Sequence, residues 1–120
     1  MLVRPKIVQK GWGEEVWIHN DKEYCGKILR FFKAGNKFSL HYHIIKKESW
    51  YVGKGSFKYI MLNTETGTEI ETTIHTGTCV TIKRGVPHQL IALEDMSEIF
   101  EVSTQHFDED SYRIRIGDKF

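Results

Sequence analysis

The 120-residue chain balances 17 lysines and arginines against 16 aspartates and glutamates, which gives a formal net charge of +1. This balance offers no electrostatic case for nucleic acid or for a membrane surface as a partner. A chain of this length can bury a hydrophobic core of its own, so the fold needs neither a metal nor a disulfide merely to exist. We therefore expect one domain over residues 1–120.

The N-terminal residues contain no long apolar run, so we expect no signal peptide and no transmembrane segment. The two cysteines, Cys25 and Cys79, lie in strand-like stretches without a metal-binding spacing. We interpret them as two buried or half-buried thiols in a reducing compartment, which makes the cytoplasm the expected location.

Turn residues interrupt β-branched and aromatic residues at short intervals, and helix signals are poor. This pattern is typical of a β-sandwich or a small barrel. The N-terminal segment and its strand occupy residues 1–22, and a charged tail, residues 105–120, could fold over an edge or a pocket. The expected strands are 14–20, 24–33, 37–43, 49–55, 56–63, 69–76, 78–83, 88–94 and 97–104.

Two histidines alternate on one of these strands. Residues i and i+2 of a strand share a face, so His41 and His43 point the same way. The opposite face carries Phe38, Leu40 and Tyr42. Periodicity alone leaves two interpretations open. Either the apolar residues form the core and the histidines face solvent, or the histidines line a barrel and the apolar face packs against a second sheet or subunit.

Two later residues favour the interior position. Glu48 begins the next strand, and a hairpin can return it to the side of His43. A strand, a turn at residues 83–87 and a new strand deliver His88 to the same interior, while Gly55 suits the intervening tight turn. Three imidazoles and one carboxylate suit a divalent transition metal and leave positions open for water or substrate.

The same residues resemble the first cupin motif, G-x5-HxH-x3,4-E-x6-G, with matches at Gly35, His41, His43, Glu48 and Gly55. The second motif, G-x5-PxG-x2-H-x3-N, follows after 21 residues, with matches at Gly77, Gly85 and His88. Lys83 and Ala92 replace its proline and its asparagine. The resemblance implies an all-β cupin double-stranded β-helix, or jelly-roll β-barrel, that is usually dimeric.

The resemblance also implies one divalent metal per chain, and the sequence does not select among Zn, Mn, Fe, Ni and Co. Its implied ligands are His41, His43, Glu48 and His88. Ligands must be deprotonated, so we expect binding to weaken as the pH falls through the histidine range near about 6.5. The apolar face opposite the histidines needs cover, and we therefore expect a homodimer.

A narrower resemblance joins the chain to the cupin domain of type II phosphomannose isomerases. It rests on residues 10–18, 39–52, 99–102 and 108–120. His41 stands where that family often has glutamine, Ile44 and Ile45 stand at its histidine positions, and Ser49 replaces a histidine. The resemblance implies isomerisation or epimerisation of a sugar or sugar phosphate, with the metal polarising a carbonyl and the adjacent hydroxyl.

Four further residues are candidates for substrate binding. Arg113 and Tyr112 lie in the tail that resembles the isomerase segment, and Arg113 would grip a phosphate or carboxylate bidentately. Trp50 would share the face of Glu48 and form a pocket wall, and Lys83 would lie on the pocket rim. The simpler alternatives are a solvated arginine and a core or interface aromatic. No general base is identified, although Glu48 is a candidate.

Other polar residues have simpler interpretations. Lys46 and Lys47 are expected in a solvated turn, and His19, His75 and His106 are expected on the surface or in ordinary hydrogen bonds. Two alternatives to an isomerase stay open. One is an Fe(II)-dependent dioxygenase with the same four ligands, and the other is a non-catalytic sugar-binding module.

Overall fold

The computed structural model describes residues 1–119, and every regular element in that range is a β-strand. Phe120, the last residue of the predicted tail, lies outside the described residues. The strands are β1 (Lys6–Lys10), β2 (Gly13–Asn20), β3 (Cys25–Phe31), β4 (Leu40–Tyr42), β5 (Glu48–Lys54), β6 (Ser56–Asn63), β7 (Thr68–His75), β8 (Cys79–Ile82), β9 (His88–Ala92), β10 (Ser97–Ser103) and β11 (Tyr112–Arg115).

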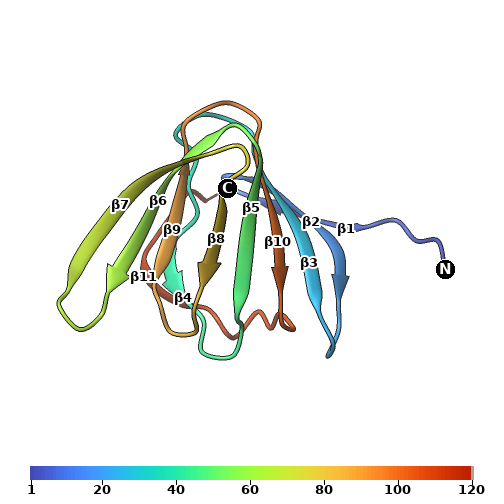
Figure 1. The fold of residues 1–120 in the computed structure, drawn as a ribbon. Helices are drawn as coiled ribbons and strands as arrows, with labels where there is room; N and C mark the ends of the chain where they lie inside the picture. Colours follow the sequence, from blue (N-terminus) through green and yellow to red (C-terminus); the bar gives the residue numbers. More distant parts are fainter. Residues whose placement is uncertain (120) are drawn as a thin grey trace.

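The strands form two antiparallel sheets that face each other (Figure 1). The six-stranded sheet has the order β1-β2-β3-β10-β5-β8, and the five-stranded sheet has the order β11-β4-β9-β6-β7. Most neighbours are distant in sequence, so the chain passes repeatedly between the sheets as a jelly roll does. The predicted all-β barrel is confirmed. In residues 1–119 we find no helix that is long and apolar enough to span a membrane.

All nine predicted strands occur as β2 to β10, with shifted ends. The structure adds two edge strands, β1 and β11, that the sequence did not predict. Their side chains are mostly exposed, so they lack the apolar face on which the prediction depended. The strand expected at residues 37–43 is the least regular, because only Leu40–Tyr42 pair as a strand.

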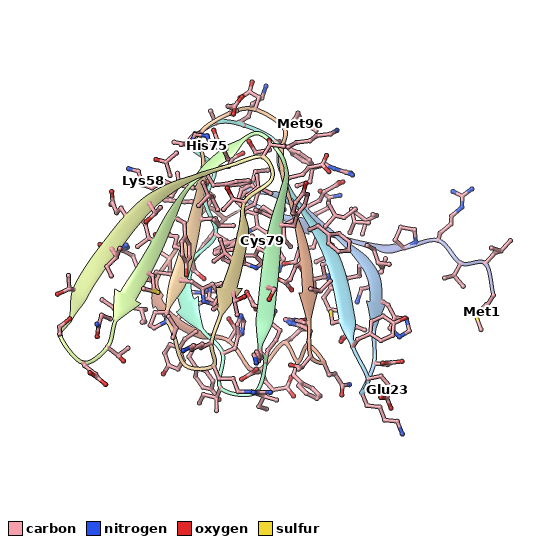
Figure 2. The ribbon with its side chains drawn as sticks, in the orientation of Figure 1. Met1, Glu23, Lys58, His75, Cys79 and Met96 are labelled. Carbon is pink, nitrogen blue, oxygen red and sulfur yellow. The ribbon has the colours of Figure 1, made fainter. Side chains whose placement is uncertain are left out.

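The barrel interior changes character from one end to the other. One end, which carries the β9–β10 turn with Met96, is apolar, and its core includes Phe31, Val52 and Phe57. The opposite end, which carries the β2–β3 turn with Glu23, holds the buried charged residues (Figure 2). Phe38 bridges the two ends, because its ring centroid lies 6.0 Å from that of Phe31 and 5.2 Å from that of His41.

The tight turn expected at Gly55 is present between β5 and β6. Gly55 has a φ of +72°, and a β-carbon there would collide with the side chain of Ser97. Only glycine meets both conditions without strain, because other residues rarely adopt positive φ. This position of the first motif is therefore explained by the fold and not by the metal.

The predicted alternation around the histidines fails at Phe38. This residue precedes β4, and its ring lies inside the barrel, 5.2 Å from the ring centroid of His41. Leu40 is 1% exposed within the single chain, and Tyr42 stacks on Tyr112 of β11. The apolar residues therefore do not form one face that needs a second subunit as cover, and the homodimer stays a prediction.

Candidate metal centre

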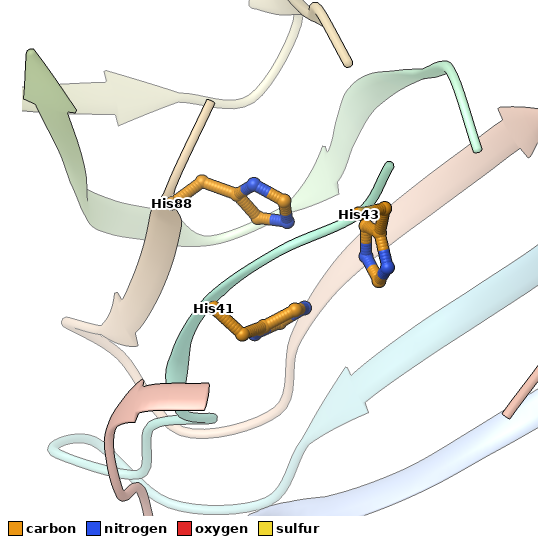
Figure 3. A group of neighbouring side chains, drawn as sticks. All are labelled: His41, His43 and His88. Carbon is orange, nitrogen blue, oxygen red and sulfur yellow. The ribbon is translucent and has the colours of Figure 1, made fainter. Parts of the chain in front are cut away.

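The three motif histidines come together at the charged end of the barrel. His41 on β4 lies directly opposite His88 on β9, and paired residues of neighbouring strands place their side chains on the same face. His43 follows the end of β4. The ring centroids lie 4.6 Å apart for His41 and His88, 4.8 Å for His41 and His43, and 5.4 Å for His43 and His88. Figure 3 shows the three rings grouped around one space.

Each of these rings is oriented by a hydrogen bond from its Nδ1 atom to a backbone carbonyl. A carbonyl can only accept, so Nδ1 carries the proton and the Nε2 lone pair is left available. Such outer hydrogen bonds commonly fix the tautomer and orientation of metal-binding histidines. The acceptors are the carbonyls of Ser39 for His41 (2.7 Å), Asp110 for His43 (2.6 Å) and Val86 for His88 (2.9 Å).

Glu48 completes the group. Its Oε2 atom lies 3.6 Å from His43 Nε2, and its Oε1 atom lies 3.5 Å from His88 Nε2. Glu48 Oε2 and His88 Nε2 are buried and have no hydrogen-bond partner among residues 1–119. Unsatisfied buried polar atoms are uncommon and costly, and a cation between them would satisfy both.

The residues therefore fit a divalent metal. His41, His43 and His88 offer ligand nitrogens that lie within 4.8 Å of one another, so the three can hold an ion. Burial lowers the pKa of His88 to about 3 and that of His43 to about 4, and it lowers the pKa of His41 well below the usual value. The imidazoles are thus neutral at neutral pH, which is the form that binds metal.

The prediction that Lys46 lies in a solvated turn is wrong. It is 5% exposed, and its ammonium donates to Glu101 Oε2 at 3.3 Å. The same ammonium lies 3.2 Å from Glu48 Oε2 as an ion pair without hydrogen-bond geometry. Burial opposes the charge of Lys46, but Glu101 and Glu48 outweigh it and raise its pKa. The turn therefore brings a permanent cation against the candidate ligand.

The two buried carboxylates, Glu48 and Glu101, have pKa values that are shifted in opposite directions. Burial, reinforced by the charge of Glu101, raises the pKa of Glu48 to about 7. Burial also acts on Glu101, but the ammonium groups of Lys46 and Lys27 outweigh it and lower the pKa of Glu101. Glu101 is therefore the permanent counter-ion of the lysines, while Glu48 stays able to exchange its proton for a metal.

A cavity of about 650 Å³ reaches the histidines and Glu48. Its walls include β1 and parts of residues 106–119, so the tail does border the site. Arg113 on β11 pairs with His41 on β4, which places both side chains on the cavity face. Within residues 1–119, the ion pairs include none with Arg113. Its guanidinium is thus free to meet a ligand.

The other predicted substrate residues divide into two groups. Trp50 lies beside the metal centre, with its ring centroid 5.4 Å from that of His88, and its Nε1 donates to Glu101 Oε1 at 3.3 Å. Tyr112 lies on the opposite face of β11 from Arg113, and Lys83 lies in an exposed turn. The cavity walls include neither of these two residues.

The sequence did not identify the buried partners Lys27, Glu101 and Asp110 as part of the site. A signal for Glu101 was present in its strand. Phe100 and Val102 on β10 are 42% and 48% exposed, whereas Glu101 between them is 4% exposed. Ile99 shares the face of Glu101, so this strand carries apolar residues on both faces, and its pattern is compatible with an inward Glu101.

No family model and no curated protein matches the chain. Solved structures do match. Oxalate decarboxylase from Bacillus subtilis aligns with 92% of this chain and 30% of its own, at 18% identity and a TM-score of 0.80. CapF from Staphylococcus aureus, a capsular polysaccharide assembling protein, aligns with 96% of this chain and 34% of its own, at 17% identity and a TM-score of 0.81.

A third match is of similar length. KdgF from Halomonas sp. aligns with 80% of this chain and 81% of its own, at 17% identity and a TM-score of 0.68. The chain spans only about a third of oxalate decarboxylase and of CapF. These likenesses concern the fold. The chain is a single cupin-fold barrel with three histidines that can bind a metal.

Proposed function

We propose that this cupin binds one divalent metal through His41, His43, His88 and Glu48 and acts on an anionic sugar derivative as an isomerase or epimerase. The observation that carries the metal assignment is the buried His88 Nε2, which has no partner among residues 1–119 and lies 3.5 Å from Glu48, beside two further imidazoles whose Nε2 lone pairs are available. A purely structural cluster would leave this nitrogen unsatisfied at a cost of about 1–3 kcal/mol.

The charges around the site favour an anionic ligand. Two lysines lie against three carboxylates, in the pairs Lys27–Glu15, Lys46–Glu48 and Lys46–Glu101. A divalent ion would bring the positive charges to four, against the four negative charges of these three carboxylates and the buried Asp110, so the cluster itself would be balanced. The charge that favours an anion is that of Arg113, which lines the cavity and has no ion pair among residues 1–119.

The protein residues would divide the work. A bound ion supplies a Lewis acid that polarises a carbonyl and its neighbouring hydroxyl. Phe38 and Trp50 pack against the histidine rings and exclude water from that side. Arg113 would orient a phosphate or carboxylate of the substrate from β11, the strand next to that of His41. Glu48 is the candidate to hold or release the transferred proton, through a carboxylate oxygen that does not bind the ion.

The names of two structural neighbours agree with this substrate class. CapF is described as a capsular polysaccharide assembling protein, and oxalate decarboxylase is named for a small dicarboxylate. Proteins that contain this fold therefore include one named for a polysaccharide and one named for a small anion. The phosphomannose isomerase resemblance of the sequence adds the choice of isomerisation, and it remains part of the proposal.

The test begins with elemental analysis of protein purified without an affinity tag. We expect about one divalent metal per chain, as cupin-type mixed nitrogen and oxygen sites bind one ion. The loaded protein is then mixed with aldose and ketose phosphates, and interconversion is followed by NMR in D₂O while dissolved oxygen is monitored. Solvent deuterium in the product supports the proposal. Oxygen uptake would assign the dioxygenase instead, and binding without conversion would assign the sugar-binding module.

The homodimer remains part of the proposal, but its interface is placed on a different surface from the apolar residues opposite the histidines that motivated it. The outer face of the six-stranded sheet carries one row of apolar residues in register across five strands, namely Ile7, Val16, Ile28, Phe100 and Tyr51. A row of alternating charge lies beside it, with Arg30 bonded to Glu14 at 2.8 Å and to Glu98 at 3.3 Å. A second copy in antiparallel orientation would match both rows.

Light scattering tests this dimer directly. The parent should have the mass of two chains at micromolar concentration, and Phe100→Glu should have the mass of one. A parent with the mass of one chain would remove the homodimer from the proposal without affecting the metal site.

A reducing, cytoplasmic location remains the prediction from the two free cysteines, although Cys79 proves to be exposed and not half-buried.

A further inference from the structure

Asp110 in the C-terminal tail binds the loop that joins two candidate metal ligands. Its carboxylate accepts hydrogen bonds from three consecutive backbone N–H groups, those of Ile44 (2.9 Å), Ile45 (3.0 and 3.2 Å) and Lys46 (2.9 Å). Its own backbone carbonyl accepts the Nδ1 proton of His43 at 2.6 Å. Asp110 is 2% exposed, so these bonds are shielded from water.

The same loop is held from its other side. The N–H of Gly85 donates to the carbonyl of His43 at 2.7 Å, and Arg84 Nε donates to the carbonyl of Ile45 at 2.7 Å. Lys47 and Thr104 exchange two further bonds of 3.1 and 3.0 Å. The turn before His88, the end of β10 and the tail therefore all converge on residues 43–47.

Apolar packing contributes little to the shape of this loop. Ile44 and Ile45 are 55% and 53% exposed, so their side chains do not anchor it. The backbone hydrogen bonds must define its conformation instead, and a carboxylate that faces three amides makes the strongest of them. The loop begins at His43 and ends at Glu48, so any change in its path alters the separation of these two side chains.

We propose that Asp110 is a positioning residue of the metal centre. It sets the path of the loop between His43 and Glu48, and it fixes the tautomer of His43 through its carbonyl. The tail that lies across the cavity is thus part of the metal site and not only its cover. This inference rests on the proposed metal site, but the conformation of the loop at residues 43–48 can be measured without metal.

The competing explanation is that Asp110 only stabilises the fold. The two roles differ in what they predict for metal affinity at equal folding. Substitution of a residue that only stabilises the fold lowers the melting temperature and leaves the metal affinity of the folded protein unchanged. Substitution of a positioning residue lowers the metal affinity of the folded protein as well, because returning the ligands to the binding geometry then costs free energy.

The experiment compares Asp110→Ala and Asp110→Asn with the parent, and uses Glu109→Gln at the neighbouring, exposed position as the matched control. Zn²⁺ affinity is measured by calorimetry on folded protein. We expect the dissociation constant to rise by about 10–100-fold in Asp110→Ala, as for the loss of an outer partner of a metal ligand. Asp110→Asn, which keeps one acceptor oxygen, should fall between the parent and Asp110→Ala. Glu109→Gln should match the parent.

Metal-free protein gives the second readout. Amide hydrogen exchange at residues 44–46 should be slow in the parent and fast in Asp110→Ala, because the variant lacks the carboxylate that accepts from these three N–H groups. A folded Asp110→Ala that keeps the parental Zn²⁺ affinity overturns the inference. If the parent binds no metal, the proposed function fails, and unchanged exchange at residues 44–46 in Asp110→Ala would then overturn the positioning role on its own.

Discussion

The two ends of the barrel interior are built by the same strands and yet differ in chemistry. On β10 the inward positions run from Ile99 to Glu101, and on β5 they run from Val52 to Glu48. The alternation of each strand therefore determines which side chains face inward, but not whether they form a core or a site. That difference depends on which inward residues lie level with one another across the sheets.

The two ends also derive their order from different forces. At the apolar end, Phe31, Val52, Phe57 and Ile99 are completely buried, and the removal of their area from water stabilises the fold. At the charged end, burial of Lys46, Glu48 and Glu101 costs desolvation free energy. Ion pairs and backbone hydrogen bonds offset that cost. We therefore expect substitutions at one end to change stability and substitutions at the other to change metal binding.

The largest expected effect is the loss of metal from the charged end. His88→Ala and His43→Ala each remove a ligand nitrogen, so metal content should fall from about one ion per chain to near zero. Elemental analysis and calorimetry measure this loss. His75→Ala replaces an exposed histidine on β7 and serves as the control. Parental metal binding by a His43→Ala, His88→Ala double variant would place the site elsewhere.

The matching substitution at the apolar end is Phe57→Ala. Phe57 is completely buried against Phe31, and its truncation should lower the free energy of unfolding by about 3–5 kcal/mol. Urea denaturation measures this change. The folded variant should bind metal like the parent, because the ring does not contact the charged end. A large loss of affinity in folded Phe57→Ala would show that the two ends are not separable.

A smaller effect is expected at the cavity wall. Arg113→Ala should weaken binding of a phosphorylated sugar by roughly one to two orders of magnitude, which corresponds to about 1.5–3 kcal/mol for a charge-assisted contact. Arg113→Lys should recover only part of the affinity, because lysine lacks the planar fork. Metal content should not change in either variant.

Arg115→Ala is the matched control for this experiment. Arg115 lies on the same strand but pairs with Glu69, away from the cavity. Calorimetry with a sugar phosphate and with the unphosphorylated sugar separates the anionic contact from the rest of the ligand. Equal binding by Arg113→Ala and the parent would leave the tail without a role in substrate recognition.

The smallest expected effect is the dependence of metal affinity on pH. The structure shifts the predicted transition from the histidines to Glu48, because the pKa is about 4 for His43, about 3 for His88 and about 7 for Glu48. Below pH 7 the metal must displace a proton from Glu48. Calorimetry in buffers of different ionisation enthalpy should detect release of about one proton per ion at pH 6. Release that instead begins only below pH 4 would contradict this assignment.

In the metal-free protein, the contributions of Glu48 and His88 to the stability should change in opposite directions with pH. The raised pKa of Glu48 makes a contribution that is complete below its ordinary value of 4.5 and is lost as the pH rises through about 7. The lowered pKa of His88 makes a contribution that is complete above 6.5 and is lost as the pH falls toward about 3. Glu48→Gln should therefore gain melting temperature over the parent as the pH rises from 5 to 8.

Local spacing explains why much of the site could be predicted. His41, His43 and Glu48 belong to one strand, one turn and the next strand, and His88 follows a recognisable glycine turn. The parts that were missed depend on long-range pairing. Asp110 meets residues 44–46 across more than 60 positions, and only the sheet order determines that contact. Phe38 was placed on the wrong face because its strand is too short to impose alternation there.

The fold shows the same division. Strands with an apolar face were predicted, whereas the edge strands β1 and β11 were not, because pairing with a neighbour and not burial defines them. β11 is the strand that places Arg113 opposite His41. Both unpredicted strands therefore border the cavity.

The central claim is that the charged end of the interior is a metal centre of three imidazoles and one carboxylate. X-ray absorption spectroscopy of the protein loaded with Zn²⁺ or Mn²⁺ tests it most directly, because it counts ligand types around the ion. We predict three imidazole ligands and at least one oxygen, with one imidazole lost in His88→Ala. A spectrum without imidazole scattering, or one unchanged by His88→Ala, would contradict the account.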